Sequence, residues 1–332
     1  MRRHVAFAAA LAIAVPLAAQ SAAVTAHPQD TLQNNNGNLA PLGVISNGAL
    51  AEARTMILVP ARELPPVPSI LSAIYVHAQS AVTIDYATLQ VLVSPTTATG
   101  LNLAFNANHS IVPWPAMLAT NTQVAYTGGW TRIPFPAPFP YDGTSSLLIE
   151  IVKVVQPGAA GFPFATMSTS SSPPRTDRPP MVYAFGGPGS GASTNAFGTQ
   201  YANSIAYQLE WNGAPTIRHR GNPGASGNQY NLGGSVTVTF QGTPGNLYIM
   251  AAGTGYLPVD VPLPGFAGAL RLANATTFAS GLLGLTGEDG VAFTIPTTPA
   301  LVGFFIAYQG VALDIATQAI TFTNGSDHFV NP

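Results

Sequence analysis

The sequence predicts an all-β protein in which two antiparallel β-sandwich domains, jelly-roll-like or immunoglobulin-like, follow a signal peptide. The first indication is a series of short runs in which Val, Ile, Thr and aromatic residues alternate with polar residues, as they do in half-buried strands. The second is the 33 Gly and 30 Pro residues that separate these runs, because both residue types are common in turns. The third is the lack of a helical apolar period after the N-terminus, and the glycines of residues 278–285 argue against a helix there.

The first 26 residues have the pattern of an export signal. Two arginines provide a positive start, residues 5–19 are apolar, and small residues lead to a cleavage motif at residues 24–26. We therefore expect cleavage before His27, with Ala23 as the alternative. No run reaches the length of about 18 apolar residues that a spanning helix needs. We expect a secreted or cell-surface protein without a membrane span.

The charge and the cysteine content exclude several classes of function. Only 7% of the residues are charged, the net charge is −2, and Lys153 is the single lysine. Such a chain lacks the basic surface that binds nucleic acid. The absence of cysteine excludes disulfides, thiol catalysis and cysteine-ligated zinc. The fold must therefore be held together by core packing.

The composition divides the rest of the chain into four segments. Residues 27–43 are rich in Asn and Gln and are expected to form a flexible leader. Residues 44–212 are expected to form the larger, jelly-roll-like sandwich, and residues 229–332 the smaller one. Between them, residues 213–228 contain Gly, Pro and a basic triplet and are predicted to be a linker.

The larger domain has a strong apolar pattern in its first half. Residues 69–79 and 82–94 are predicted to be a pair of strands, and the alternation of the second fails at Thr88, which indicates a register shift. A long excursion follows over residues 94–115. The expected strands are residues 55–60, 69–79, 82–94, 122–126, 130–135, 145–155, 181–185 and 203–211.

Residues 130–155 are the stretch around which this domain is organised. A short strand enters a bend that carries four prolines at 134, 136, 138 and 140, and proline confines a segment to a sheet edge or a connection because it cannot donate to the ladder. Gly143 supplies the backbone freedom of a tight turn. The apolar residues 145–155 are then predicted to be a buried central strand.

The smaller domain repeats the same rhythm over shorter distances. Its turn signals, such as Gly242-Thr243-Pro244-Gly245, separate runs that alternate as sandwich strands do. The expected strands are residues 230–240, 246–252, 269–272, 290–295, 301–314 and 318–323.

Two runs carry a resemblance to a known class of proteins. The run from Trp130 through Tyr141-Asp142-Gly143 to Glu150 resembles one in secreted bacterial β-sandwich proteins of uncharacterised function. The closing run, residues 295–325, resembles the second module of the same tandem proteins. The resemblance implies an extracellular location and tandem sandwiches, and it implies no catalytic residues.

Motifs for catalysis are incomplete in this sequence. Residues 191–195 and 224–228 begin like a nucleophile elbow but lack its final glycine and a following helix, and the glycine-rich residues 187–191 lack the lysine of a phosphate-binding loop. A glycosidase needs two carboxylates close together, and nothing in the sequence selects a pair. We expect Glu150 to face solvent or to pair with an arginine such as Arg132. The protein is therefore predicted not to be an enzyme.

Metal binding has one candidate. No histidines have zinc spacing, and His77 is expected to be a hydrogen-bonded residue of a strand. Secreted sandwiches bind calcium through loop carboxylates, but no D-x-D-x-D-G loop is present, so no cofactor is predicted and calcium stays an alternative. Its candidate ligands are Asp142, Asp177, Glu288 and Asp289.

Carbohydrate binding through aromatic platforms is the more specific alternative. It requires planar rings that are exposed beside polar groups. Trp114, between two prolines in the long excursion, and Tyr201 are the candidates, whereas Trp130 and Trp211 are expected to be core residues of strands.

These observations favour a secreted, non-catalytic protein with a structural, adhesive or matrix role. The alternative is a carbohydrate-binding protein, and the third hypothesis is a glycan-directed hydrolase. The expected partners are extracellular polysaccharide or further copies of the same chain.

Overall fold

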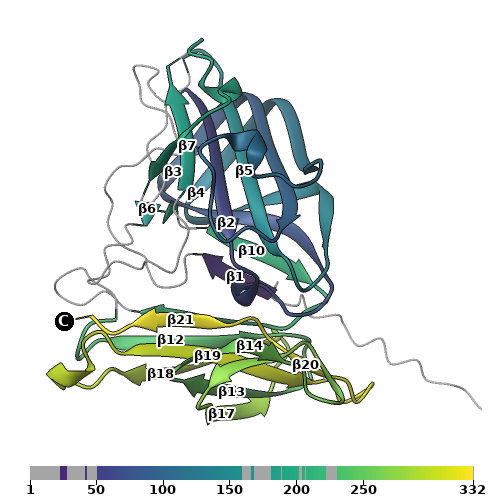
Figure 1. Ribbon diagram of the computed structural model, residues 1–332, viewed down its shortest axis with the longest axis vertical. Coiled ribbons are helices and arrows are strands. Elements are labelled where there is room, and N and C mark those ends of the chain that lie inside the picture. The colour runs from purple at the N-terminus through teal and green to yellow at the C-terminus, as the bar shows by residue number, and fades with distance from the viewer. Residues whose placement is uncertain are drawn as a thin grey trace, which may run out of the picture.

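The computed structural model describes residues 23–27, 42, 51–158, 166–167, 181–187, 189–201, 204–205, 207–221 and 230–331. Most of this is β-strand, nearly all of the strand pairs are antiparallel, and the helices in these ranges are 3₁₀ helices of three residues. The all-β prediction is confirmed. Figure 1 shows two stacked bodies, which we call the upper body (β1 to β10) and the lower body (β11 to β21). None of the described helices is long and apolar enough to cross a membrane.

The upper body contains one long sheet and a small two-stranded one. The 3₁₀ helices η1 (Ala61–Glu63), η2 (Phe105–Ala107) and η3 (Ala192–Thr194) lie in its connections. The long sheet has the order β1 (Ala23–His27), β10 (Tyr207–Asn212), β3 (Ser69–Thr96), β5 (Ser146–Val155), β2 (Glu52–Val59), β7 (Met181–Gly186) and β8 (Thr199–Tyr201). Strand β4 (Trp114–Tyr141) also pairs with β3. In the small sheet, β6 (Thr166–Met167) pairs with β9 (Ser204–Ile205).

The prediction that residues 69–79 and 82–94 pair with each other is wrong, because both belong to the 28-residue strand β3. Residues 80 and 81 are Ser and Ala, so the segment has none of the Gly, Pro, Asn or Asp residues that favour a reversing turn most strongly. The ladder instead shifts register between Ala78 and Ala81, opposite Gly128 and Gly129 at φ 76° and 86°. This irregularity bends the ribbon without ending the strand. The expected shift near Thr88 is also present, against β5.

The strands predicted at residues 122–126 and 130–135 are likewise one strand, β4, which begins at Trp114 inside the segment predicted to be an excursion. Trp114 Nε1 donates a hydrogen bond to the carbonyl of Ala137 at 2.9 Å, so the two ends of β4 meet. The β3–β4 ribbon therefore folds back over itself. Both halves of β3 contribute to one core, with Leu71 and Ile74 from the first half and Val91 and Val93 from the second.

The prolines of β4 lie at the edge that the sequence predicts. Within the described residues β4 pairs only with β3, and its ladder shifts between Leu71 and Ala73, opposite Pro134. The segment stays a strand rather than a corner. Gly143 has φ 84° and leaves no room for a Cβ against Val67, so the turn requires glycine. β5 lies between β3 and β2, which confirms the predicted central strand.

The lower body has two main sheets. Val236, Val238 and Phe240 of the smaller sheet pack against residues such as Met250 and Tyr308 of the larger one. The smaller sheet consists of β11 (Thr216–Gly221), β12 (Ser235–Gln241) and β18 (Glu288–Thr294). The larger sheet has the order β15 (Phe266–Ala267), β20 (Ile320–Phe322), β19 (Phe305–Leu313), β13 (Leu247–Gly253) and β17 (Thr276–Leu282), and β21 (Ser326–Phe329) also pairs with β19. A separate two-stranded sheet pairs β14 (Gly255–Val261) with β16 (Leu270–Ala273), and the 3₁₀ helix η4 spans Pro299–Leu301.

Residues 216–221, predicted to be linker, form β11 and pair with β12 along its whole length. The buried side chains of Ile217 and His219 alternate with Arg218 and Arg220, which are more exposed. This period-two pattern is that of a strand. The arginines that suggested a linker are its outward-facing residues.

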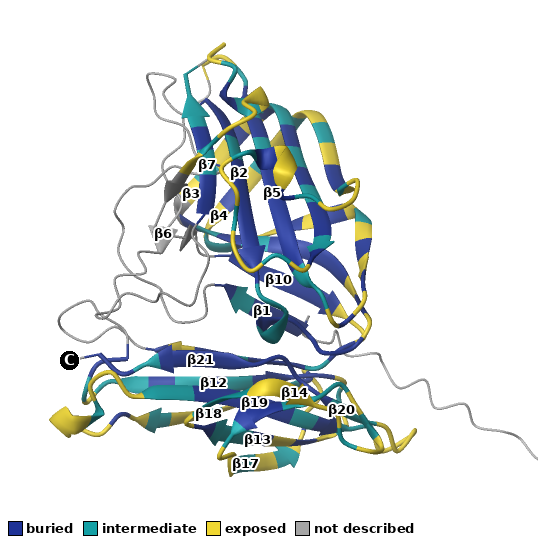
Figure 2. Cartoon of the chain, viewed as in Figure 1, coloured by how far each residue is buried: buried dark blue, intermediate teal, exposed yellow. Residues whose placement is uncertain are grey.

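The two bodies are joined by buried polar contacts. Arg271 of β16, only 3% exposed, donates through Nη1 to the carbonyls of Ala61, Arg62 and Leu64 at 2.8–3.1 Å. These carbonyls belong to η1 and its C-terminal end in the upper body, where the last carbonyls of a helix are open to further donors. Figure 2 shows that β21 is buried where it faces the upper body.

Strand β1 contains residues that the expected cleavage before His27 would remove. Thr25 is fully buried and accepts a hydrogen bond from Trp211 Nε1 at 2.9 Å, and the backbone N–H of Val24 donates to Gln241 of the lower body at 2.9 Å. A chain that begins at His27 would lose four of the five residues of this strand. Residues 1–22 and most of the predicted leader lie outside the described ranges.

Candidate functional site

A chain of hydrogen bonds joins four polar side chains on the outer face of the upper sheet. Ser94 of β3, Glu150 of β5 and Arg54 of β2 come from strands that are neighbours in the sheet. His109, from the connection after η2, lies over them. We call this set the buried relay.

The distances in the buried relay are those of hydrogen bonds. His109 Nδ1 lies 2.8 Å from Ser94 Oγ, and His109 Nε2 lies 2.7 Å from Glu150 Oε2. Because a carboxylate only accepts, Nε2 carries a proton, and in the neutral imidazole Nδ1 then accepts from the Ser94 hydroxyl. A serine, a histidine and an acid in this order are the set that the hydrolase hypothesis requires.

The relay is nevertheless closed. Ser94 is 0% exposed, and the side chains of His109 and Glu150 are 6% and 1% exposed. Arg54 Nε donates to Glu150 at 2.5 Å, and its other nitrogens donate to Asn106 and to the carbonyl of Asn195 at 2.9 Å. A substrate therefore has no approach to the serine.

The electrostatics of the relay are also those of a structural pair. Burial alone would raise the pKa of Glu150, but the hydrogen bonds from His109 and Arg54 outweigh it and hold the pKa below its ordinary value. The carboxylate is a stable anion that fixes the overlying loops through Arg54. The prediction that Glu150 pairs with an arginine is confirmed, but the partner is Arg54 and not Arg132, which binds Glu210 at 2.7 Å. Sequence distance alone could not choose between the arginines.

The serine of the motif at residues 191–195, Ser193, also stabilises the fold. Ser193, in η3, donates to Glu52 Oε2 at 3.1 Å, and the N–H of Gly189 donates to the other oxygen at 2.7 Å. Glu52 thus holds this loop against β2. Residues 224–228 lie outside the described ranges.

The aromatic candidates are only partly brought to the surface. Trp114 is 40% exposed, follows the exposed Ile111 and Val112, and has its edge toward Phe139. Tyr201 ends β8, and its side chain lies outside the described part of the structure. Trp211 is a core residue as expected.

Trp130, which was expected in the core, is only half-buried, edge-on to His77. Burial lowers the pKa of His77, and Arg220 lowers it further. The predicted hydrogen bond of His77 is not present at Nδ1, a buried atom without a partner in the described structure.

The calcium candidates do not converge. Asp142 accepts from the N–H groups of Thr144 and Ser145 and caps its own turn at 2.7–2.9 Å. In the lower body Glu288 accepts from Gln241, and Asp289 accepts from Tyr248, at 2.9 and 2.5 Å. Asp177 lies outside the described residues. Among the residues that are described, no three acids or histidines approach closely enough to hold a metal ion.

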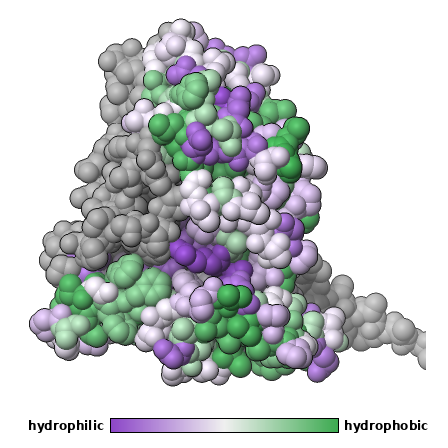
Figure 3. Space-filling view, viewed as in Figure 1, coloured by the Kyte–Doolittle hydropathy of each residue, from purple (hydrophilic) through white to green (hydrophobic). Residues whose placement is uncertain are grey.

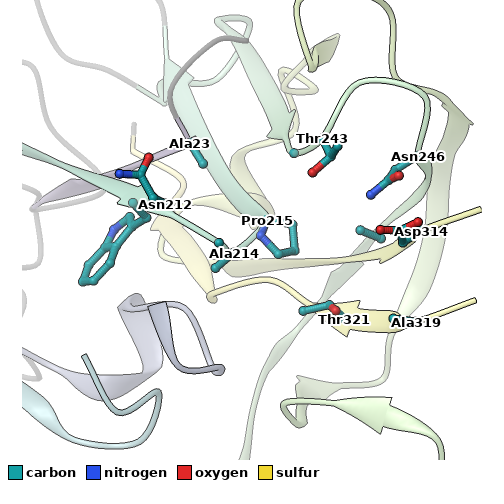
Figure 4. Close-up of a pocket in the computed structure, with 13 residues that line it drawn as sticks. Ala23, Asn212, Ala214, Pro215, Thr243, Asn246, Asp314, Ala319 and Thr321 are labelled. Carbon is teal, nitrogen blue, oxygen red and sulfur yellow. The ribbon is translucent and has the colours of Figure 1, made fainter. Parts of the chain in front are cut away.

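A polar cavity of about 460 Å³ lies at the junction of the two bodies. Much of its wall is formed by the small side chains of Ala, Gly and Pro residues from both bodies, including Ala23 of β1. Figure 4 shows Thr243, Asn246 and Asp314 around the same space. Its polar side chains are Asn212, Thr243, Asn246, Asp314 and Thr321. We call it the junction pocket.

Two strands and two turns supply these side chains, and Thr321 lies in β20. Asn212 ends β10, Thr243 and Asn246 belong to the turn between β12 and β13, and Asp314 begins the turn between β19 and β20. Asp314 Oδ1 accepts from the N–H groups of Ala316 and Thr317, 2.9 and 3.1 Å away, which fixes the carboxylate. Sequence analysis missed the pocket because each segment alone has only the signature of a turn.

Neither a scan against protein-family models nor a search of curated proteins finds a match to this sequence. The geometry is therefore the basis on which function is inferred.

Proposed function

We propose that this chain is a secreted, non-catalytic protein of two β-sandwich modules with a structural or adhesive role, and that it acts by self-association through its lower body. The observation that carries the proposal is an apolar face on the larger sheet of that body. The separate cores of the two bodies support the division into modules.

The apolar face lies on the outer side of β13, β17 and β19. Leu247 is opposite both Leu282 and Leu313, and Ile249 of the next row is opposite Val311. Leu247, Ile249 and Leu282 are 41%, 47% and 58% exposed, and a groove of about 340 Å³ runs between the rows. Figure 3 shows apolar surface on the lower body. Contiguous exposed apolar residues mark interaction surfaces.

A second copy of the chain is the partner that this face fits. Two sheets pack face to face at about 10 Å with their strands within about 30°, and a two-fold axis brings the same patch of each copy together. The face contains no charge that would repel an identical surface. With 7% charged residues, the chain has little long-range repulsion between copies.

The closed state of the buried relay supports the non-catalytic part of the proposal. The most enzyme-like set of side chains in the described residues has a serine with no exposed surface. Its acid is neutralised by an arginine that also holds two loops.

The proposed route to the outside of the cell is the N-terminal export signal. Because β1 is hydrogen-bonded to β10 and to Gln241, we propose that processing leaves residues 23–27 on the exported protein. The first module then starts at β1, and the second starts at β11.

Sedimentation velocity of the purified protein over a range of concentrations tests the self-association. We expect a reversible dimer that Ile249→Lys converts to a monomer, because a lysine in the centre of the face buries an unpaired charge. Val259→Lys, at a 71% exposed position of β14, is the matched control and should leave the dimer intact. A wild-type protein that stays monomeric at about 1 mM would contradict the proposal.

Glycan binding through Trp114 is a second candidate, favoured by the 40% exposure of this ring beside exposed Ile111 and Val112. A polysaccharide binding screen of the wild type and of Trp114→Ala tests it. Binding that is lost in the variant supports the platform, and binding that is unchanged removes it.

A further inference from the structure

We propose that the junction pocket binds an uncharged carbohydrate unit. This site differs from the Trp114 platform and from the apolar face, and it does not depend on self-association. Its volume of about 460 Å³ lies within the range of about 300–1,000 Å³ that small-ligand sites occupy. Its position between two bodies is one in which such sites are common.

The chemistry of the lining matches a polyol. Asn212 and Asn246 each offer a donor and an acceptor, and Thr243 and Thr321 offer hydroxyls that do both. Sugar hydroxyls also donate and accept, so each can be paired twice. Within the described part of the chain, the side chains of Asn212, Thr243 and Asn246 have no hydrogen-bond partner in the protein. They are available to a ligand.

The same lining argues against other classes of ligand. The residues that line the pocket include no Lys, Arg or His, so a phosphate, sulfate or carboxylate would find no counter-charge. The apolar part of the wall consists mainly of Ala, Gly and Pro, whose small side chains offer little area to a lipid or an aromatic ring. Trp211 is 1% exposed, and its indole donates to Thr25 rather than into the pocket.

Asp314 provides a fixed hydrogen-bond acceptor that would orient the ligand in the pocket. Its Oδ1 is occupied by the N–H groups of Ala316 and Thr317, so the carboxylate cannot rotate freely. The second oxygen has no partner in the described structure and can accept from a pair of neighbouring hydroxyls. A fixed acceptor costs little entropy when the ligand binds.

The walls of the pocket are held by the contacts between the bodies. Ala23 and Asn212 stand on one side, and Val24 next to Ala23 is hydrogen-bonded to Gln241 on the other. The pocket therefore exists in full only when the two bodies are docked, and a ligand that fills it should stabilise the docked state by mass action.

Isothermal titration calorimetry against neutral monosaccharides and their short oligomers, with glucuronate and glucose 6-phosphate as charged probes, tests the proposal. We expect saturable binding of at least one neutral sugar at one site per chain. The charged probes should bind about tenfold more weakly or not at all, since nothing in the pocket neutralises them.

Variants locate the site. Asn246→Ala and Asp314→Asn should each weaken sugar binding by about tenfold. In Asp314→Asn, the new asparagine keeps the oxygen that caps the turn, so the turn should stay folded. Trp114→Ala and Ile249→Lys are the matched controls and should bind as the wild type does. Circular dichroism melts of each variant show whether it is folded.

Two results would overturn the proposal. One is the absence of saturable binding by every neutral sugar at about 10 mM. The other is binding that survives both pocket substitutions or is lost in Trp114→Ala, which would place the ligand elsewhere. Since Ile249→Lys leaves the pocket intact, failure of the pocket and failure of the self-association are measured separately.

Discussion

The buried relay and the junction pocket contain similar side chains in opposite situations. In the relay, Glu150 and Ser94 are 1% and 0% exposed and each is hydrogen-bonded. In the pocket, Thr243 is exposed and its hydroxyl has no partner among the described residues. A polar group that is buried must be paired inside the protein, whereas one at an open cavity can pair with a ligand. The difference agrees with a stabilising role for the relay and with the ligand binding that we propose for the pocket.

The largest effect is expected at the acid of the relay. Glu150→Ala should lower the free energy of unfolding by about 3–5 kcal/mol, because it leaves the buried His109 and the partly buried Arg54 without their shared acceptor. Guanidinium chloride unfolding measures this. Asp85→Ala, at an exposed carboxylate of β3, is the control and should change stability by about 0.5 kcal/mol or less. Equal effects of the two substitutions would show that the relay is not a stabilising element.

Arg271 at the junction should come next. Arg271→Met removes donors from three carbonyls of the upper body and should lower the free energy of unfolding by about 2–3 kcal/mol. Asp260→Asn, at the half-exposed partner of the same arginine, should have a small effect, since exposed ion pairs contribute about 0–1 kcal/mol. A loss at Asp260 as large as the loss at Arg271 would mean that the ion pair, not the carbonyl cluster, joins the bodies.

Lys153 should make stability depend on pH. Burial lowers its pKa to about 7 in the folded protein, while the unfolded chain has the ordinary value of 10.5. Between these values the unfolded chain binds one more proton, so the free energy of unfolding should rise with pH by about 1.4 kcal/mol per unit. Urea unfolding at pH 7 and pH 9 should show this rise in the wild type and a smaller one in Lys153→Met. The same slope in both proteins would assign it to other groups.

The smallest effect is expected in the pocket. Thr243→Ala and Asn246→Ala remove side chains that make no hydrogen bond in the described protein, so the melting temperature should stay close to that of the wild type and the free energy of unfolding within about 0.5 kcal/mol. A loss of about 2 kcal/mol or more would show that these residues support the turn itself.

The sequence predicts single strands better than it predicts their connections. Residues 145–155 are a central strand because they are apolar on both faces, and the prolines of β4 mark an edge because they cannot donate. The prediction that residues 69–79 and 82–94 are two paired strands failed because a bulge and a turn both interrupt the alternation of apolar residues.

The candidate sites depend on contacts that sequence does not contain. Whether Glu150 meets Arg54 or Arg132 depends on which strand lies beside β5, and β2 precedes it by about 90 residues. The junction pocket collects side chains from two turns and two strands that lie far apart in the sequence. The same limit applies at the N-terminus, because the pattern of small residues 24–26 does not reveal that Thr25 accepts a hydrogen bond from Trp211.

The absence of cysteine from the chain allows a direct test of the difference between the relay and the pocket. Ser94→Cys and Thr243→Cys each introduce a single thiol, and the rate of its reaction with a disulfide reagent reports exposure. We expect the thiol at position 243 to react at about the rate of the unfolded chain and the thiol at position 94 to react at least about 1,000 times more slowly, through unfolding alone. Rapid reaction at position 94 in the folded protein would contradict the account, since it would show that the serine of the relay is open to substrates.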